Sequence, residues 1–469
     1  MAKIALIGAG SVVWARRLMM DILSFEELRD STLSLMDVDP VRLETSRKTV
    51  ERLAEQLHAP ARVEASLSRR DAVDGADYVI FAVQVGMHDA TLLDFEIPRK
   101  YGLRQTIADT LGVGGIFRGL RTVPVLLGLL REMEEVCPEA LLLNYVNPMS
   151  ILCLAAERAS SIETVGLCHS VQGTSRQLAR YMGVPYEQLG YRVAGINHMA
   201  WFLELTKPGG EGKSGLREDA YPRLWEVMGD PAVFAKDKVR FEMMRRLGYF
   251  VTESSEHMAE YVPYFIKRPE EIERLDIPID EYVKRSADNL KKFEQTRHEV
   301  ESGKAIEMRL SHEYAAYIIR AIEANQDWSF NGNVPNSLDR RTAALIPNLP
   351  ADSIVEVPCL VNRAGLQPCH AGELPAQLAG LNRSHITVHQ LAVEAALHGN
   401  RDALYQAVML DPHTASVLTV DEIWHMTDEL VEAHGTALPT MLPRRLYGAP
   451  NRPAAPPTKR EAPPAAVAV

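Results

Sequence analysis

The sequence predicts an α/β fold, a Rossmann-like doubly wound sheet followed by a second domain of α+β type. Over about the first 170 residues, short apolar runs alternate with helical patterns, which is typical of a parallel sheet with crossover helices. A glycine turn follows the first of these runs, and beyond about residue 215 the alternation gives way to longer helical stretches. We therefore expect a nucleotide-binding domain at 1–195, a second domain at 196–447, and a disordered tail rich in Pro and Ala at 448–469.

Composition argues against nucleic-acid and membrane partners. The 469 residues are 46% hydrophobic and carry a formal net charge of −11, from 51 Lys and Arg against 62 Asp and Glu, and the basic residues are scattered. No apolar run approaches the ~18 residues of a membrane span, and the five cysteines form no regular spacing. These observations predict a cytoplasmic protein with reduced thiols.

The first element is a strand over Lys3 to Ile7, followed by a glycine turn and a helix. Gly8 and Gly10 allow the backbone to approach a pyrophosphate, and Ser11 opens the helix whose amides and dipole would hold its charge. The third glycine of the usual dinucleotide motif is absent, so the turn alone is weak evidence.

The second strand, Thr32 to Met36, strengthens the dinucleotide interpretation because it ends in a carboxylate, Asp37. No arginine immediately follows Asp37, which suits a hydrogen bond to a ribose 2′-hydroxyl and favours NAD over NADP. For Asp39, the helix N-cap interpretation is preferred to a cofactor contact because Pro40 suits the first helical position.

Two further buried runs continue the predicted sheet. Tyr78 to Val83 is apolar throughout, as expected of a strand covered on both faces, and it ends at Gln84, a candidate cofactor contact. Ala140 to Leu143 leads to Asn147. Ligands of such sheets bind in the crevice at the carboxyl ends of the strands.

A fifth strand, Thr164 to Leu167, delivers Cys168 and His169 to the same edge. A thiolate there, beside a dinucleotide signature, suggests a metal, although a lone free cysteine is more often a small buried hydrophobe. His198 interrupts a later apolar run, Tyr191 to Leu205; it is either a core histidine or, with Cys168, part of a metal site with open positions.

Two other segments allow two interpretations each. The glycine-rich stretch Asp109 to Gly115 permits close approach to a ligand, and it also fits a mobile surface loop. Gly248 to Tyr264 is dense in polar groups, which fits a site wall or a hydrogen-bonded packing layer.

The chain resembles glycoside hydrolase family 4 over nearly its whole length, to about residue 445. Six motifs carry the resemblance, in this order: GAGS, MDVDP, DTLGVGG, NYVNPM, GLCHSVQGT and GINHMA. Within that family, His169 after the cysteine resembles the α-galactosidase version, which acts on unphosphorylated sugars. Members with aspartate or asparagine at that place resemble phospho-sugar enzymes.

The resemblance implies a fold like that of lactate and malate dehydrogenases, a tightly bound NAD and a divalent metal, usually manganese. It implies Cys168 and His198 as metal ligands and Asn147 as a sugar contact. Asp109 would increase the basicity of a catalytic tyrosine, Tyr261 or, as the second choice, Tyr264. His169 is one candidate for the acid at the leaving group, and a water is another.

The implied reaction is hydrolysis of an α-galactoside through oxidation at C3, elimination across C1–C2, water addition and re-reduction, outside the usual two-carboxylate scheme. The tyrosinate would remove the C2 proton, helped by a lowered pKa. Alternatives are an α-glucosidase, an α-glucuronidase or galacturonidase of the same family, and an NAD-dependent sugar dehydrogenase. Relatives assemble as dimers or tetramers, so a homodimer or homotetramer is expected.

Overall fold

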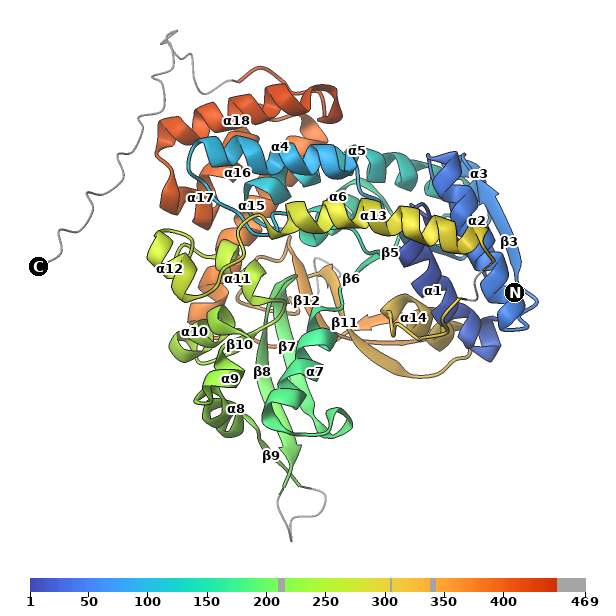
Figure 1. The fold of residues 1–469 in the computed structure, drawn as a ribbon, viewed down its shortest axis with the longest axis horizontal. Helices are drawn as coiled ribbons and strands as arrows, with labels where there is room; N and C mark the ends of the chain where they lie inside the picture. Colours follow the sequence, from blue (N-terminus) through green and yellow to red (C-terminus); the bar gives the residue numbers. More distant parts are fainter. Residues whose placement is uncertain (210–215, 304–305, 338–342, 445–469) are drawn as a thin grey trace, which may run out of the picture.

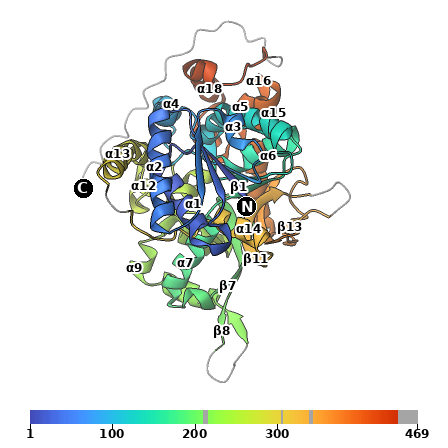
Figure 2. The same cartoon turned by 90° about the vertical axis from the view of Figure 1, so that its right-hand side faces the viewer.

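The structure is a computed structural model that describes residues 1–209, 216–303, 306–337 and 343–444. The predicted tail at 448–469 lies outside the described residues. One thirteen-stranded sheet runs through the described chain, with helices on both of its faces (Figures 1 and 2). The strands are β1 Lys3–Ile7, β2 Thr32–Met36, β3 Arg62–Ser66, β4 Tyr78–Phe81, β5 Leu141–Asn144, β6 Thr164–Leu167, β7 Gly190–Ile196, β8 Met199–Pro208, β9 Arg217–Asp219, β10 Phe250–Val251, β11 Trp328–Pro335, β12 Ile354–Asn362 and β13 Gly365–Pro368.

The N-terminal strands form the parallel part of this sheet. Their spatial order is β3-β2-β1-β4-β5-β6, and each neighbouring pair is parallel. That order, reversing between β1 and β4, is the one of the doubly wound dinucleotide-binding fold. The predicted Rossmann-like α/β fold is therefore confirmed.

The sheet continues beyond β6 through antiparallel strands, in the order β6-β11-β12-β7-β8-β10. The predicted domain boundary at 195/196 falls inside β7. Because hydrogen bonds connect the two halves into one sheet, the elements that follow this boundary are held directly against the parallel part. The division into two domains stays a prediction.

Helices pack against both faces of the sheet. Figure 2 shows α1, α2 and α4 to one side of the parallel strands and α5, α6 and α15 to the other. The helices are α1 Val12–Ser24, α2 Pro40–Gln56, α3 Arg69–Val73, α4 Met87–Lys100, α5 Gly112–Val136, α6 Met149–Ala159, α7 Ser170–Met182, α8 Tyr221–Met228, α9 Pro231–Phe234, α10 Lys238–Leu247, α11 Ser255–Tyr261, α12 Pro269–Arg274, α13 Glu281–Glu301, α14 Tyr314–Glu323, α15 Ala376–His398, α16 Arg401–Leu410, α17 Pro412–Val417 and α18 Val420–His434.

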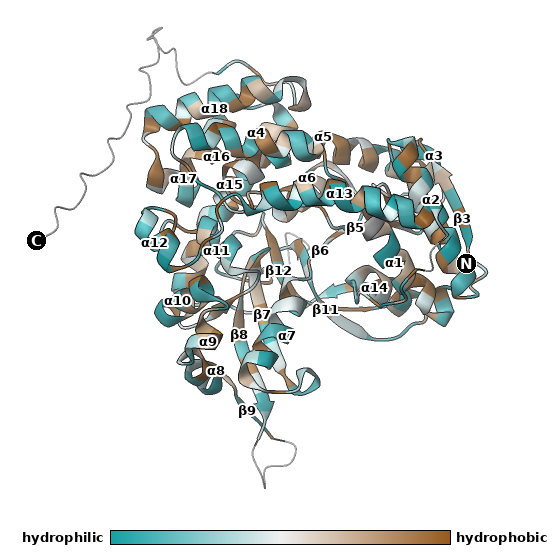
Figure 3. Cartoon of the chain, viewed as in Figure 1, coloured by the Kyte–Doolittle hydropathy of each residue, from teal (hydrophilic) through white to brown (hydrophobic). Residues whose placement is uncertain are grey.

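Successive side chains of the central strands enter different hydrophobic cores. In β1, Ile4 and Leu6 pack in the core on one face, while Ala5 and Ile7 pack in the core on the other. The two-residue period of a strand requires this when both faces are covered. Figure 3 accordingly shows α13 largely hydrophilic, because little of this helix enters a core.

The strands lie close to their predicted positions. β1, β2 and β6 have the predicted bounds, whereas β4 ends two residues earlier than expected and β5 begins one residue later. The N-cap interpretation of Asp39 is confirmed, since Asp39 Oδ1 accepts from the Val41 and Arg42 amides at 2.9 and 3.1 Å and Pro40 opens α2.

The glycine-rich stretch is not a mobile surface loop, and that alternative was wrong. Gly112 begins α5, and the first turn of this helix is buried. A Cβ on Gly114 would lie 2.5 Å from the Ala108 carbonyl oxygen, and one on Gly115 would lie 2.6 Å from the Thr110 carbonyl carbon. The glycines therefore let residues 108–110 pack directly on the helix.

Among the described residues, α5 is the one helix long and apolar enough to cross a membrane. Its 25 residues suffice by length and composition, with a mean hydropathy of 1.4 over the best window. However, 78% of that window is buried inside the fold. The apolar character of α5 is that of a core helix.

A buried ion pair connects α4 and α5, and α18 joins it through a histidine. Arg121 donates to both oxygens of Asp94 at 3.1 and 2.6 Å, and His434 Nε2 lies 2.9 Å from Asp94 Oδ1. The side chains of Asp94 and Arg121 are at most 3% exposed. Removing one charge of such a pair leaves the other buried without compensation.

We expect Asp94→Asn to lower the free energy of unfolding by about 3–5 kcal/mol, measured by urea denaturation. The control is Glu204→Gln, which removes the carboxylate of the exposed Arg192–Glu204 pair and should cost less than about 1 kcal/mol. Equal losses in the two variants would contradict the assignment of a structural role to the buried pair.

Candidate active site

The glycine turn after β1 lies directly against Asp37. The amides of Gly8 and Ala9 donate to the Met36 carbonyl at 2.9 Å, and the Gly10 amide donates to Asp37 Oδ2 at 2.7 Å. Gly8 has φ +95°, and a Cβ on Gly10 would lie 2.5 Å from Asp37 Oδ2. Only glycine fits both positions, so the turn and the carboxylate form one unit.

The N-terminus of α1 is open to an anion. Ser11 is the N-cap residue but makes no side-chain capping bond, and the first turn contains no acidic residue. The helix dipole therefore favours a negative group here. Gln84 follows β4, the strand next to β1, and its Nε2 donates to the Met87 carbonyl at 3.4 Å. The predicted cofactor residues thus lie at the carboxyl ends of β1, β2 and β4.

Aromatic contacts join this turn to the corner after β6. The Trp14 ring, in the first turn of α1, has its centroid 5.3 Å from that of Tyr145 and 6.3 Å from that of His169. A ligand on the glycine turn would therefore lie beside the Cys168–His169 corner.

Asn147 lies between these two regions, after β5. Its peptide bond to Pro148 is cis, and Arg118 Nε donates to its carbonyl at 3.0 Å. Asn147 Oδ1 is buried and has no hydrogen-bond partner among the described residues. Because a buried acceptor without a donor is costly, this oxygen suits a ligand hydroxyl.

Cys168 and His198, the predicted metal ligands, lie together. Cys168 follows β6, and His198 is at the tip of the tight turn between β7 and β8, with φ +63°. Burial lowers the pKa of His198 to about 4, so its imidazole is in the neutral, ligating form. Burial raises the pKa of the Cys168 thiol, and the charges of Glu253 and Glu356 raise it further.

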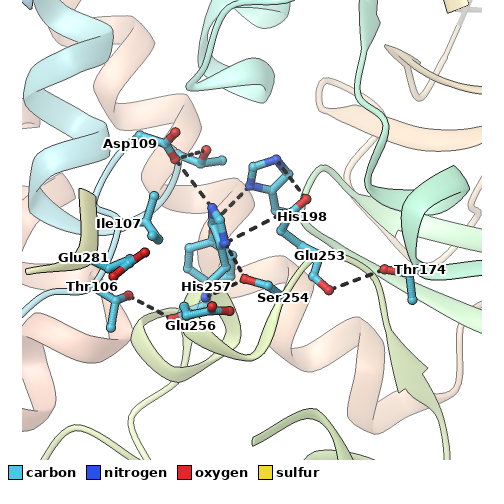
Figure 4. A network of polar contacts seen from close by, with 12 residues as sticks. Thr106, Ile107, Asp109, Thr174, His198, Glu253, Ser254, Glu256, His257 and Glu281 are labelled. Atoms are coloured by element: carbon cyan, nitrogen blue, oxygen red, sulfur yellow. Dashed lines mark hydrogen bonds and ion pairs between the residues drawn. The ribbon is translucent and has the colours of Figure 1, made fainter. Parts of the chain in front are cut away.

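Glu253 completes a group of three ligand atoms that all lie within 4.8 Å of one another: Cys168 Sγ, a His198 ring nitrogen and a Glu253 carboxylate oxygen. Figure 4 shows the Glu253 side chain beside those of His198 and His257; its two oxygens lie 3.6 Å from His198 Nε2 and from His257 Nδ1. Burial opposes ionisation of Glu253, but the neighbouring histidines and Arg240 hold its pKa at about 2. Sulfur, nitrogen and oxygen donors at this spacing fit a divalent transition metal with open positions.

The backbone of Glu253 is held in an uncommon conformation. Its φ is +66°, and the buried Arg240 donates to its carbonyl oxygen. Arg240 is itself fixed by Asp237, with bonds of 2.7 and 2.5 Å to the two carboxylate oxygens. A non-glycine residue in the left-handed region persists only where its surroundings determine it, as they do here.

Tyr261, Asp109 and His257 lie on the other side of His198. The Tyr261 hydroxyl is 3.0 Å from His198 Nδ1, and His257 Nε2 is 3.9 Å from Asp109 Oδ1. Asp109, His198 and His257 also form a group of ligand atoms within 4.8 Å. Tyr264, the second choice for the catalytic tyrosine, is 56% exposed on the surface. The geometry favours Tyr261.

The charges around Tyr261 act in a direction that we did not expect. Burial alone would raise the pKa of Asp109, but Arg118, His257 and His198 lower it, so Asp109 is ionised. Burial, and then the charges of Asp109 and Glu260, raise the pKa of Tyr261 well above its usual value. The expected lowering is therefore wrong for the protein as described, and Asp109 makes the tyrosine oxygen more basic.

A polar cavity of about 300 Å³ opens beside Glu253 and His169. It is lined by hydroxyl groups, amides and charged side chains, including His169, Ser170, Thr174, Arg240, Glu253 and Glu256. His169 is exposed, and Ser170 Oγ is buried with no hydrogen-bond partner among the described residues. A ligand rich in hydroxyl groups would suit this lining.

Three residues of the site were missed by the sequence reasoning: Glu253, His257 and the neighbouring Glu260. All three lie in Gly248 to Tyr264, the segment whose density of polar groups fits a site wall. That density was the available signal, but it did not distinguish which polar groups face the ligand atoms.

The chain is similar in sequence to proteins of one known family. A sequence model of the family 4 glycosyl hydrolases matches residues 3–184, and the model of the C-terminal domain of that family matches residues 193–414. An α-galactosidase of Bacillus subtilis (strain 168) is 45% identical over 94% of this chain and 99% of its own, and one of Rhizobium meliloti (strain 1021) is 37% identical over 93% and 89%.

Among solved structures, a putative glucosidase of Bacillus subtilis superposes with a TM-score of 0.80 at 25% identity, over 92% of this chain and 99% of its own. A 6-phospho-α-glucosidase from gut microorganisms, crystallised with NAD and Mn²⁺, has a TM-score of 0.78 at 19% identity, over 94% and 100%. The similarity to the 6-phospho-α-glucosidase shows a shared fold. Because the two family models between them match most of the sequence, the chain belongs to the family 4 glycosyl hydrolases.

Proposed function

We propose that the protein is an NAD- and Mn²⁺-dependent α-galactosidase that hydrolyses unphosphorylated α-galactosides. The observation that carries this proposal is the group of Cys168, His198 and Glu253 ligand atoms beside the glycine turn. Two relatives named α-galactosidase, at 45% and 37% identity over most of the chain, support the substrate class.

The residues present fit both cofactors. Gly8, Gly10 and Ser11 would hold the pyrophosphate of NAD, Gln84 would contact the cofactor, and the Asp37 carboxylate suits a ribose hydroxyl but would repel the 2′-phosphate of NADP. Cys168 and His198 would hold Mn²⁺, with Glu253 beside them. When bound, NAD accepts and returns the C3 hydride and Mn²⁺ acts as a Lewis acid, which permits oxidation, elimination across C1–C2, water addition and re-reduction.

The chain's own residues bind the sugar and move protons. Asn147 Oδ1 accepts from a sugar hydroxyl, since it is buried and lacks another donor. Tyr261, in its tyrosinate form, would take the proton from C2; Asp109 makes that tyrosinate more basic, and a divalent cation held at Cys168 and His198 would favour the deprotonated form. His169 faces the cavity and donates a proton to the leaving oxygen.

The charges of the cavity favour a neutral sugar over a uronate or a phospho-sugar. The guanidinium of Arg240 donates hydrogen bonds to both carboxylate oxygens of Asp237, so this cation is not available to a substrate anion. Glu253 and Glu256 add two further carboxylates to the lining. Lys236 is a further cation of the lining, so three carboxylates face two cations there, and a carboxylate on the substrate would meet more negative than positive charge.

The first prediction concerns the proton at C2. Hydrolysis of an aryl α-galactoside in heavy water, with NAD, Mn²⁺ and thiol, should release galactose that carries deuterium at C2, because the base exchanges its proton with solvent. Proton NMR of the released sugar measures this. Galactose with its C2 proton retained would contradict the elimination route, and NADH accumulating without galactose would indicate a sugar dehydrogenase.

The second prediction concerns the metal. Cys168→Ser should weaken Mn²⁺ binding by more than the ~10–100-fold that loss of an outer partner costs, because a hydroxyl is a poor substitute for a thiolate. Electron paramagnetic resonance of free Mn²⁺ measures the affinity directly. Cys369→Ser, at an exposed cysteine, is the matched control and should bind as the wild type does. Unchanged Mn²⁺ affinity in Cys168→Ser would refute the assignment.

The third prediction concerns substrate charge. We expect kcat/KM for an aryl α-galactoside to exceed that for the matching α-galacturonide by at least ~100-fold, which corresponds to about 2.7 kcal/mol. A ratio near one, or a preference for the uronide, would move the α-galacturonidase interpretation to first place.

A further inference from the structure

Glu260, in α11, is a buried carboxylate to which the reaction proposed above assigns no role. It is 2% exposed, and it lies next to Tyr261 in the sequence. Its Oε2 accepts from the Thr106 amide at 2.8 Å and its Oε1 from the Ala108 amide at 2.8 Å. The Ile107 amide lies between the two oxygens, at 3.3 and 3.2 Å.

Three consecutive backbone amides thus converge on one side chain. Successive N–H groups point to one place only where the backbone leaves regular conformations, and Ala108 accordingly has φ +51°. A left-handed alanine is uncommon and requires support from its surroundings. Glu260 supplies that support, because its two oxygens match the three donors.

The segment that Glu260 holds leads directly to the reacting groups. Asp109 follows Ala108, and it faces His257, which belongs to the same short helix as Glu260. A second bond, from Thr106 Oγ1 to the Glu256 carbonyl at 2.8 Å, joins the same two segments (Figure 4). The distance between Asp109 and Tyr261 therefore depends on the hydrogen bonds that join residues 106–108 to α11.

We propose that Glu260 is a positioning residue that fixes Asp109 against His257 and Tyr261, and that it thereby sets the rate of proton removal from C2. The inference rests on the proposed function. Glu260 acts through the backbone of residues 106–108, and it contacts neither the Cys168 nor the Glu253 ligand atom by any bond recorded for the described residues.

The loop has other anchors, so a variant of Glu260 should still fold. The Asp280 and Tyr282 amides donate to the Gln105 and Thr106 carbonyls at 2.9 and 3.0 Å. Gln105 Nε2 also donates to the Asp94 carbonyl at 2.8 Å. These bonds hold the start of the loop, whereas Glu260 holds the part next to Asp109.

The test compares wild type with Glu260→Gln on an aryl α-galactoside bearing hydrogen or deuterium at C2. Glutamine keeps the volume, but its NH₂ group would face a backbone donor. We expect kcat to fall by about 10–100-fold, as a displacement near 1 Å does, and the isotope effect on kcat to rise. KM should change by less than about threefold, and Mn²⁺ affinity by paramagnetic resonance should equal that of wild type.

Glu242→Gln is the matched control, because Glu242 is also buried but pairs with Arg245 and Arg246 on α10. It should leave the isotope effect unchanged. If Glu260→Gln does not fold, Glu260→Asp, which keeps the charge and retracts it by one methylene, carries the test with the same expected direction.

Two results would overturn the inference: a folded variant with wild-type kcat and isotope effect, or a parallel loss of Mn²⁺ affinity, which would indicate general disruption of the site. Failure of the proposed function is separate, because it would appear in the wild type as galactose without deuterium at C2.

Discussion

The parallel hydrogen-bond register of β1, β4, β5 and β6 is the constraint on which the site depends. Ile7 pairs with Phe81, Phe81 with Asn144, and Asn144 with Gly166, so these strands end at one edge of the sheet. The residues that follow them are Gly8, Gln84, Asn147 and Cys168. The glycine turn, Gln84, Asn147 and the Cys168 thiol are therefore brought together by backbone hydrogen bonds alone.

The antiparallel half of the sheet completes the site because it is bonded to the parallel half. β11 pairs with both β6 and β12, and β12 pairs with β7, whose turn to β8 carries His198. β10, paired with β8, leads to Glu253 and then to α11. The ligand atoms from both halves of the chain thus have a common rigid support.

Three residues around this site have a strained backbone conformation. His198, Glu253 and Ala108 all have positive φ without being glycine, and each is held by its surroundings: a tight hairpin turn, the buried Arg240 and the carboxylate of Glu260. Such conformations cost of order 1–3 kcal/mol each. The hydrogen bonds that offset this cost also fix the directions of the side chains, which favours a preorganised site.

Burial makes the few charges of the site strongly interdependent. The pKa values of Asp109 and Glu253 are lowered by the histidines when these are protonated, and by the permanent charges of Arg118 and Arg240 respectively. The same burial raises the pKa values of Cys168 and Tyr261. The directions of these shifts depend on which groups are buried together, and this depends on packing.

The sequence by itself determined the parallel sheet and most of the residues at the carboxyl ends of its strands. Short apolar runs and the glycine turn are local patterns, and residues close together in the sequence are enough to specify the strands and the turn. Those patterns, or the family's motifs, were enough to predict Gly8, Gly10, Asp37, Cys168 and His198 as site residues. The tertiary structure alone decided the positions of Glu253, His257 and Glu260, since their side chains reach the site only when β10 and α11 pack on the sheet. It likewise buried Tyr261 and left Tyr264 exposed on the surface. It also decided that the pKa of Tyr261 is raised, because burial and the proximity of charges are properties of the packed chain.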